Sequence, residues 1–159
     1  MNRLPPIKNP NDLKTMFKQI QEEHKELKFF VYGTYADLIA ASRSDMKYPC
    51  LMLETPNDVY NDNGADYILR GFESAFIVLL TQDRDDNRQE LEAKAGEIAE
   101  DILARLHMES IEYMDFHYRI DGARAELIDP MTQDNDVGYR VEFKIQRVGG
   151  VEHNPEKWN

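Results

Sequence analysis

Apolar residues recur at helical spacing in two segments of the chain. In the first segment they are Leu13, Met16, Phe17, Ile20 and Leu27, and in the second they are Leu91, Ala95, Ile98, Ile102 and Leu106. Asn9-Pro10-Asn11 precedes the first segment, and an early proline beside a capping asparagine is typical of a helix start. The pattern predicts an N-terminal helix that ends near residue 28 and a long amphipathic helix that ends near residue 107.

Strand periodicity is clearest near the end of the chain. There the apolar positions are Val137, Tyr139, Val141, Phe143 and Ile145, and the polar positions between them are Arg140, Glu142, Lys144 and Gln146. This alternation predicts an antiparallel strand with one buried and one wet face. Upstream, we expect KFFVYG and YPCLMLE to form short strands and DYILRGFESAFIVLLTQ a long one. The second half of the long strand is apolar on both faces, which is typical of a central, covered strand.

Turn formers and glycines separate these segments. Residues 55–66 are dense in turn formers and predict a long polar loop, residues 129–136 predict a second one, and ADLIAASRS predicts a short helix or an irregular turn. Gly71 is expected at a bend or bulge. Beyond Gly122 the apolar phase slips by one residue, which indicates a β-bulge. Gly149-Gly150 is expected to end the last strand.

The order of these elements predicts an α+β fold. We expect a single antiparallel or mixed β-sheet, with the N-terminal helix and the long helix of the C-terminal half packed on it and a closing β-hairpin. A chain of 159 residues suits one domain with its own core. We place this domain at residues 1–148 and a polar C-terminal tail at residues 149–159.

Residues 81–90, TQDRDDNRQE, concentrate side-chain oxygens directly after the most apolar run of the chain. A calcium loop that starts at Asp83 would need glycine at its sixth position and a bidentate Glu at its twelfth. The chain has Arg88 and Lys94 at these two positions, so the segment does not match a calcium site. We interpret it as the start of the long helix, with Asp86 or Asn87 as the capping residue.

The formal net charge of −11 is unevenly distributed along the chain. Residues 1–50 contain eight Lys/Arg against six Asp/Glu, whereas residues 51–159 contain eleven against twenty-four. We expect no basic face of the kind that grips phosphates. Excess acidity serves solubility, or it keeps a surface from adhering to a polyanion. The single cysteine, Cys50, and the absence of a bilayer-length apolar run or an apolar leader predict a cytosolic protein without a membrane anchor.

The chain has few side chains that predict catalysis. Its histidines, His24, His107, His117 and His153, show no spacing of a helical metal site. Asp115, His117 and Glu54 could meet only through the fold, and this possibility stays open. The sequence has no nucleophile elbow, P-loop or dinucleotide fingerprint. We therefore predict no enzyme activity, no catalytic residue, no metal ligand and no cofactor.

The complete pattern resembles a family of structural proteins. A first helix, the YPCLMLE strand, a long strand that ends in FIVLLTQ, a long helix and a closing hairpin with VGYRVEFKI look like the tail terminators and related neck or tail-completion proteins of tailed bacteriophages and contractile injection systems. The resemblance covers about residues 10–148. It implies a structural virion protein of the tail or neck that forms a hexameric ring. Such a ring caps the tail tube, joins it to the head-side connector and lets DNA pass without specific binding.

Two sets of residues are candidates for the work of such a ring. Trp158, in the tail, is expected to pack against a neighbouring subunit. The acidic residues expected to face the channel, where they would repel DNA, are Asp83, Asp85, Asp86, Asp134 and Asp136. The alternative to a ring is a small cytosolic binding or regulatory protein of unknown ligand.

Overall fold

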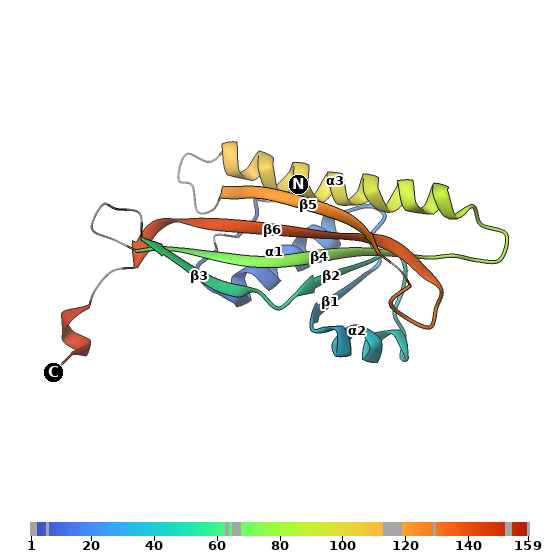
Figure 1. Cartoon of the computed structure of the whole chain (residues 1–159), viewed down its shortest axis with the longest axis horizontal. Coiled ribbons are helices and arrows are strands. Elements are labelled where there is room, and N and C mark those ends of the chain that lie inside the picture. The colour runs from blue at the N-terminus through green and yellow to red at the C-terminus, as the bar shows by residue number, and fades with distance from the viewer. Residues whose placement is uncertain are drawn as a thin grey trace.

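The computed structural model describes residues 3–5, 7–62, 64, 68–112, 119–128, 130–151 and 154–158. The elements in chain order are α1 (Pro10–Glu23), β1 (Phe29–Gly33), α2 (Tyr35–Ser42), β2 (Cys50–Glu54), β3 (Asn57–Asp62), β4 (Ile68–Thr81), α3 (Arg88–Glu112), β5 (Arg119–Ile128), β6 (Asp136–Val151) and the short 3-10 helix η1 (Pro155–Lys157). The predicted α+β class, with an N-terminal helix and a long helix in the second half of the chain, is confirmed (Figure 1).

One mixed sheet holds all six described strands in the order β1-β2-β4-β6-β5. β1 and β2 run parallel, with α2 as the connection between them, and the other neighbours are antiparallel. β3 pairs with the first half of β4, beyond the segment of β4 that pairs with β2. β4 is therefore central, as its apolar second half predicted. β1 and β5 are the outer strands of this five-strand order, and β3, which pairs only with β4 among the described strands, is a further edge strand.

The main core lies between the sheet and the layer formed by α1 and α3. Phe17 of α1, Phe76 of β4 and Phe143 of β6 meet there, with ring centroids 5.4 to 5.9 Å apart. The apolar residues of α1 and α3 that predicted the helices belong to this core. A smaller cluster on the opposite face packs Leu38 of α2 against Cys50, Met52 and Ile77. Only part of that opposite face is covered in this way, because α2 is short.

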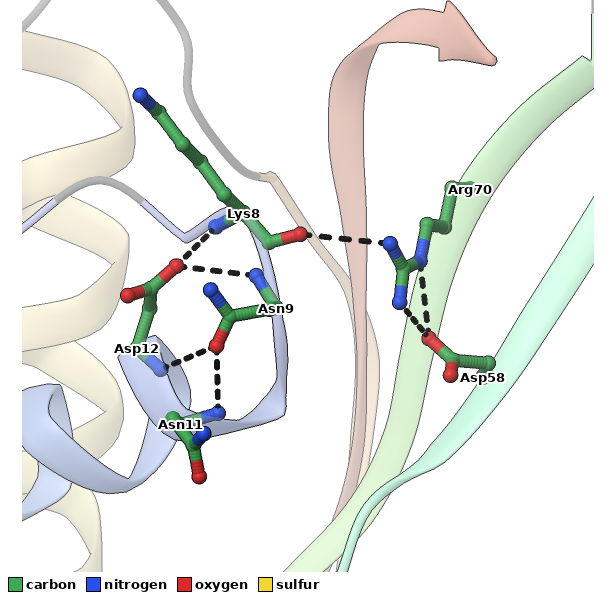
Figure 2. A network of polar contacts seen from close by, with 6 residues as sticks. All are labelled: Lys8, Asn9, Asn11, Asp12, Asp58 and Arg70. Carbon is green, nitrogen blue, oxygen red and sulfur yellow. Dashed lines mark hydrogen bonds and ion pairs between the residues drawn. The ribbon is translucent and has the colours of Figure 1, made fainter. Parts of the chain in front are cut away.

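The start of α1 is fixed by its own capping residues and lies beside β4 (Figure 2). The side chain of Asn9 accepts hydrogen bonds from the backbone N–H groups of Asn11 and Asp12, at 2.8 and 3.2 Å. The Asp12 carboxylate in turn accepts from the Asn9 N–H, which completes a capping box. Arg70 of β4 pairs with Asp58 of β3 and donates to the carbonyl of Lys8 at 3.5 Å. The capped helix start is thereby tied to the β3–β4 pair.

Three glycines determine the shape of the long strands. The pairing of β4 with β6 shifts between Leu69 and Gly71, and the pairing of β5 with β6 shifts between Ile120 and Ala123, so both predicted bulges are confirmed. Gly122 has φ +79°, a conformation that favours glycine. At Gly138 the backbone of β4 leaves no room for a side chain, since a Cβ there would be 2.0 Å from the Val78 carbonyl oxygen.

Several predicted boundaries are wrong. The expected polar loop at 55–66 contains β3, whose residues are almost all exposed and therefore carry no apolar alternation. β6 continues through Gly149-Gly150 to Val151, past the predicted domain boundary at residue 148, because residues 150 and 151 still pair with β4. α1 ends at Glu23, and α3 extends to Glu112. The N-terminal part of the predicted FHYRI strand lies outside the described residues.

Candidate functional site

Beyond α2, the sheet presents a face that no described helix covers. We call it the charged face; its residues are Glu54, Glu73, Arg124, Glu126, Arg140, Glu142 and Lys144. They come from β2, β4, β5 and β6, and part of this surface forms an open depression of about 530 Å³. The alternation of β6 predicted a wet face, and the structure places three of its four predicted polar residues here.

Arg140 is the centre of the charged face. Its Nε and Nη2 atoms donate to the two carboxylate oxygens of Glu54, at 2.7 and 2.8 Å. Its Nη1 atom pairs with Glu142 and lies 3.7 Å from Glu126. A second pair on this face joins Lys144 to Glu73 at 3.0 Å. The guanidinium is therefore bound by carboxylates from three strands, a geometry that fixes side-chain positions across the sheet.

The electrostatics of this network favour the charged forms. Hydrogen bonds with Glu54 raise the pKa of Arg140 above its ordinary value, and Arg140 lowers the pKa of Glu142. Away from this face, burial raises the pKa of Cys50 to about 12 and also raises the pKa of Tyr48. Each of these shifts moves the pKa of the group further from pH 7. None of these four groups is therefore adjusted for proton transfer near pH 7.

The two outer strands present unlike surfaces. Along β1 runs an open groove of about 400 Å³, lined by Lys14, Lys18, Gln21, Lys28 and the aromatic residues 29, 30 and 32. The Lys14 ammonium lies 5.0 Å from the centre of the Tyr32 ring. We call this surface the basic groove. The sequence did not predict this groove, because it depends on the packing of α1 beside β1.

β5, the opposite outer strand, is exposed along most of its described side chains. Ala123, Ala125 and Leu127 lie opposite Phe143, Val141 and Tyr139, so they are on the helix-bearing side of the sheet. They are nevertheless exposed, and Leu127 leaves 52% of its surface open to solvent. The bulge prediction identified this apolar set, but the exposure follows from its place at the edge of the sheet.

A third surface lies at the end of the sheet that carries β3. β3 and the paired parts of β4 and β6 extend past the end of α3, and the C-terminal segment leaves from this end (Figure 1). Tyr60, Ile68 and Val151 are large apolar residues that are exposed here, at 55%, 47% and 47%. Trp158 follows in the C-terminal segment and is 72% exposed. An exposed Trp fits the predicted contact with a neighbour, which stays a prediction.

The loops that follow β4 and precede β6 meet at the opposite end of the sheet. Gln82 donates its backbone N–H to the Asn135 carbonyl at 3.0 Å, and the Asn135 side chain donates back to the Gln82 carbonyl. Four of the predicted channel residues are exposed at this end, which we call the acidic end: Asp83, Asp85, Asp86 and Asp134. The structure therefore brings the two candidate loops together at one place, although their sequences are about fifty residues apart.

Asp136, the fifth predicted channel residue, does not belong to this exposed surface. It is fully buried, and its carboxylate accepts hydrogen bonds from the backbone N–H groups of Met131 and Thr132, at 2.6 and 3.0 Å. In the folded chain, Asp136 holds the turn before β6. This role could not be predicted from the sequence, since a structural and an exposed aspartate look alike in a polar loop.

The start of α3 confirms the capping interpretation and resolves its alternatives. The Asn87 side-chain oxygen accepts from the Gln89 N–H at 3.0 Å, so Asn87 is the cap. The carboxylate of Asp86 accepts instead from the Asp83 N–H at 2.8 Å and closes the preceding turn.

The described acidic and histidine residues form no group of three that could hold a metal ion. Glu54, one member of the possible site left open above, is bound to Arg140. The other two members, Asp115 and His117, lie outside the described residues. His24 lies 3.5 Å from Asp101 of α3, a contact between the two main helices.

These surfaces belong to a small α+β fold with a charged sheet face and two chemically different edges. A comparison with models of protein families finds no match, and a search of curated proteins finds none either. No helix in the described part of the chain is long and apolar enough to cross a membrane.

Proposed function

We propose that this protein is a structural subunit of a phage-type tail, a tail terminator or neck component that assembles into a homo-oligomeric, hexameric ring. The ring caps the tail tube, contacts the connector on the head side and is part of the virion. The observation that carries the proposal is the contrast between the two edges of the sheet. β1 borders the basic groove, whereas β5 exposes a row of alanine and leucine side chains.

Unlike edges favour a ring over a simple dimer. A two-fold dimer uses the same surface on both copies, whereas head-to-tail contacts join two different surfaces and close into a ring when the rotation permits. An open sheet edge is also an unfilled template for pairing with another chain. The structure contains the helices and strands, in the same order, on which the resemblance was based.

The charged face supports a structural role more than a catalytic one. Arg140 and its carboxylate partners are engaged with one another, and the raised pKa of Arg140 and the lowered pKa of Glu142 favour the charged forms of these two groups. Such a network gives a rigid, polar surface. No step of catalysis and no cofactor is part of the proposal.

In a ring, the acidic end would lie at the rim of the channel. Asp83, Asp85, Asp86 and Asp134 would repeat in every subunit and repel the phosphates of passing DNA. Basic residues in their place would bind the phosphates. This proposal concerns the four exposed aspartates and does not include Asp136, which is buried.

The oligomeric state tests the proposal. Native mass spectrometry over a range of protein concentrations, with electron microscopy of the same samples, should reveal closed rings of six subunits. Rings seen on the end of purified tail tubes would place them in the tail. A protein that stays monomeric or dimeric at all concentrations, with and without tubes, would favour the small binding or regulatory protein instead.

A further inference from the structure

We infer that neighbouring copies of this chain join by strand addition, with β5 of one copy pairing along β1 of the next. This inference rests on the proposed ring and names the surfaces that build it. Both strands end the sheet, so in each of them the backbone groups on the outer side have no partner strand among the described residues. Every copy of this chain carries both β1 and β5. A second copy therefore always presents the strand edge that the first copy needs.

The strand directions suit such a contact. β1 and β2 are parallel, and each following step through β4, β6 and β5 reverses direction, so β5 runs opposite to β1. A copy placed alongside in the same orientation therefore brings its β1 antiparallel to β5. Antiparallel pairs form the slightly more stable ladder, and the contact repeats identically from copy to copy.

The side chains that would meet are complementary. Phe30 and Tyr32 pack against the main core, so they point to the helix-bearing side of the sheet, where they border the basic groove. Ala123, Ala125 and Leu127 point to the same side of β5 and are exposed. In a continued sheet, these small and aliphatic side chains would lie beside the aromatic rings, a pairing that stabilises antiparallel strands.

The helices add charge complementarity to this contact. α1 contacts β1 and β2, and α3 contacts β4, β6 and β5, so the contact also brings α1 of one copy beside α3 of the next. α1 contributes the exposed Lys14 and Lys18. At about 100° per residue, Glu92 and Glu100 lie on the flank of α3 that points away from its own α1, and Glu92 pairs there with Arg88 at 2.8 Å. The two carboxylates of one copy would thus face the basic groove of its neighbour.

Disulfide crosslinking tests this contact directly. In one chain, Phe30→Cys is combined in turn with Ala123→Cys, Ala125→Cys or Leu127→Cys, which covers the possible registers. Under mild oxidation, at least one combination should give a ladder of covalent multimers, because paired strands bring Cβ atoms within disulfide reach. Chains with a single new cysteine should give covalent dimers at most, and the natural Cys50 is fully buried.

The matched controls use the opposite face of β5. Arg124→Cys and Glu126→Cys, each combined with Phe30→Cys, should lose the ladder, because alternate side chains point away from Phe30. In a second series, Lys28→Cys replaces Phe30→Cys as the cysteine on the β1 side, because this substitution leaves the core unchanged. Thermal melting verifies the fold of each variant. If rings form but no ladder of covalent multimers appears, or if both faces of β5 give equal ladders, the proposed β5–β1 contact is wrong. The proposed ring would still stand. A chain that never oligomerises would overturn both.

Discussion

Gly138 is the position where a single side chain would do most damage to the sheet. A Cβ there would lie 2.0 Å from the carbonyl oxygen of Val78, and backbone in a central strand pair cannot move aside. We expect Gly138→Ala to lower the free energy of unfolding by about 3 kcal/mol. Chemical denaturation measures this.

Gly122→Ala is the control for Gly138→Ala. Gly122 has φ +79° but no atom within 4 Å of a new Cβ, so this substitution strains only the backbone, by about 1 kcal/mol. Equal losses in the two variants would show that the contact with Val78 is not what requires glycine at position 138.

Cys50 should behave as an inert core residue. It is fully buried beneath α2, and burial raises its thiol pKa from an ordinary value near 9 to about 12. Because the thiolate is the reactive form, we expect iodoacetamide to leave the native protein unmodified at pH 8 and to alkylate it in denaturant. Mass spectrometry distinguishes the two states. Rapid alkylation of the native protein would contradict the burial of this thiol.

The raised pKa of Cys50 also predicts a direction for stability against pH. The unfolded thiol ionises near pH 9, whereas the folded thiol keeps its proton up to about pH 12, so the unfolded state is favoured as the pH rises through this window. We expect Cys50→Ala to show a weaker alkaline loss of melting temperature than the natural chain. An identical alkaline loss in both proteins would assign the effect to other groups.

At the level of secondary structure, the start of α3 contains a helix cap, Asn87, directly after a turn residue, Asp86. Asn87 accepts from the Gln89 N–H, so Asn87→Ala removes a cap and should lower the free energy of unfolding by about 1 kcal/mol. Asp86→Ala removes only a turn contact with Asp83 and should be milder. Thermal unfolding of both variants provides the comparison. A larger loss for Asp86→Ala, or a rise in melting temperature with added calcium, would contradict this interpretation.

For the assembled protein, the C-terminal segment offers a direct optical signal. Trp158 is the only tryptophan of the chain and is 72% exposed in the subunit. If it packs against a neighbour, its fluorescence emission should shift to shorter wavelength when dilute subunits are concentrated into rings, because the indole leaves water. Emission that does not change while rings form would show that the tail has no part in assembly.

Deletion of the tail is the companion experiment. The structure places the cut after Val151, since Gly150 and Val151 still pair with β4. Removal of residues 152–159 should weaken ring formation and leave the melting temperature of the subunit nearly unchanged. Normal assembly of the shortened chain would make the segment passive.

The sequence by itself determined those parts of the molecule whose physical cause is local. The period of apolar residues located α1 and α3, alternation located the two faces of β6, and a slip of phase located the bulge at Gly122. Side-chain oxygens before an apolar period placed the cap at Asp86 or Asn87, and the structure shows that it is Asn87. These features depend on neighbours within a few residues, so the local sequence pattern is enough to predict them.

Only the tertiary structure decided the surfaces. β3 escaped prediction because an exposed strand needs no apolar alternation, and its pairing with β4 came from the fold. Arg140 and Glu54 are 86 residues apart, so their ion pair depends on the order of strands in the sheet. Burial separated Asp136 from the exposed aspartates, and packing of α1 beside β1 made the basic groove. The chemistry of these surfaces depends on which distant segments come into contact, and a local sequence pattern does not show this.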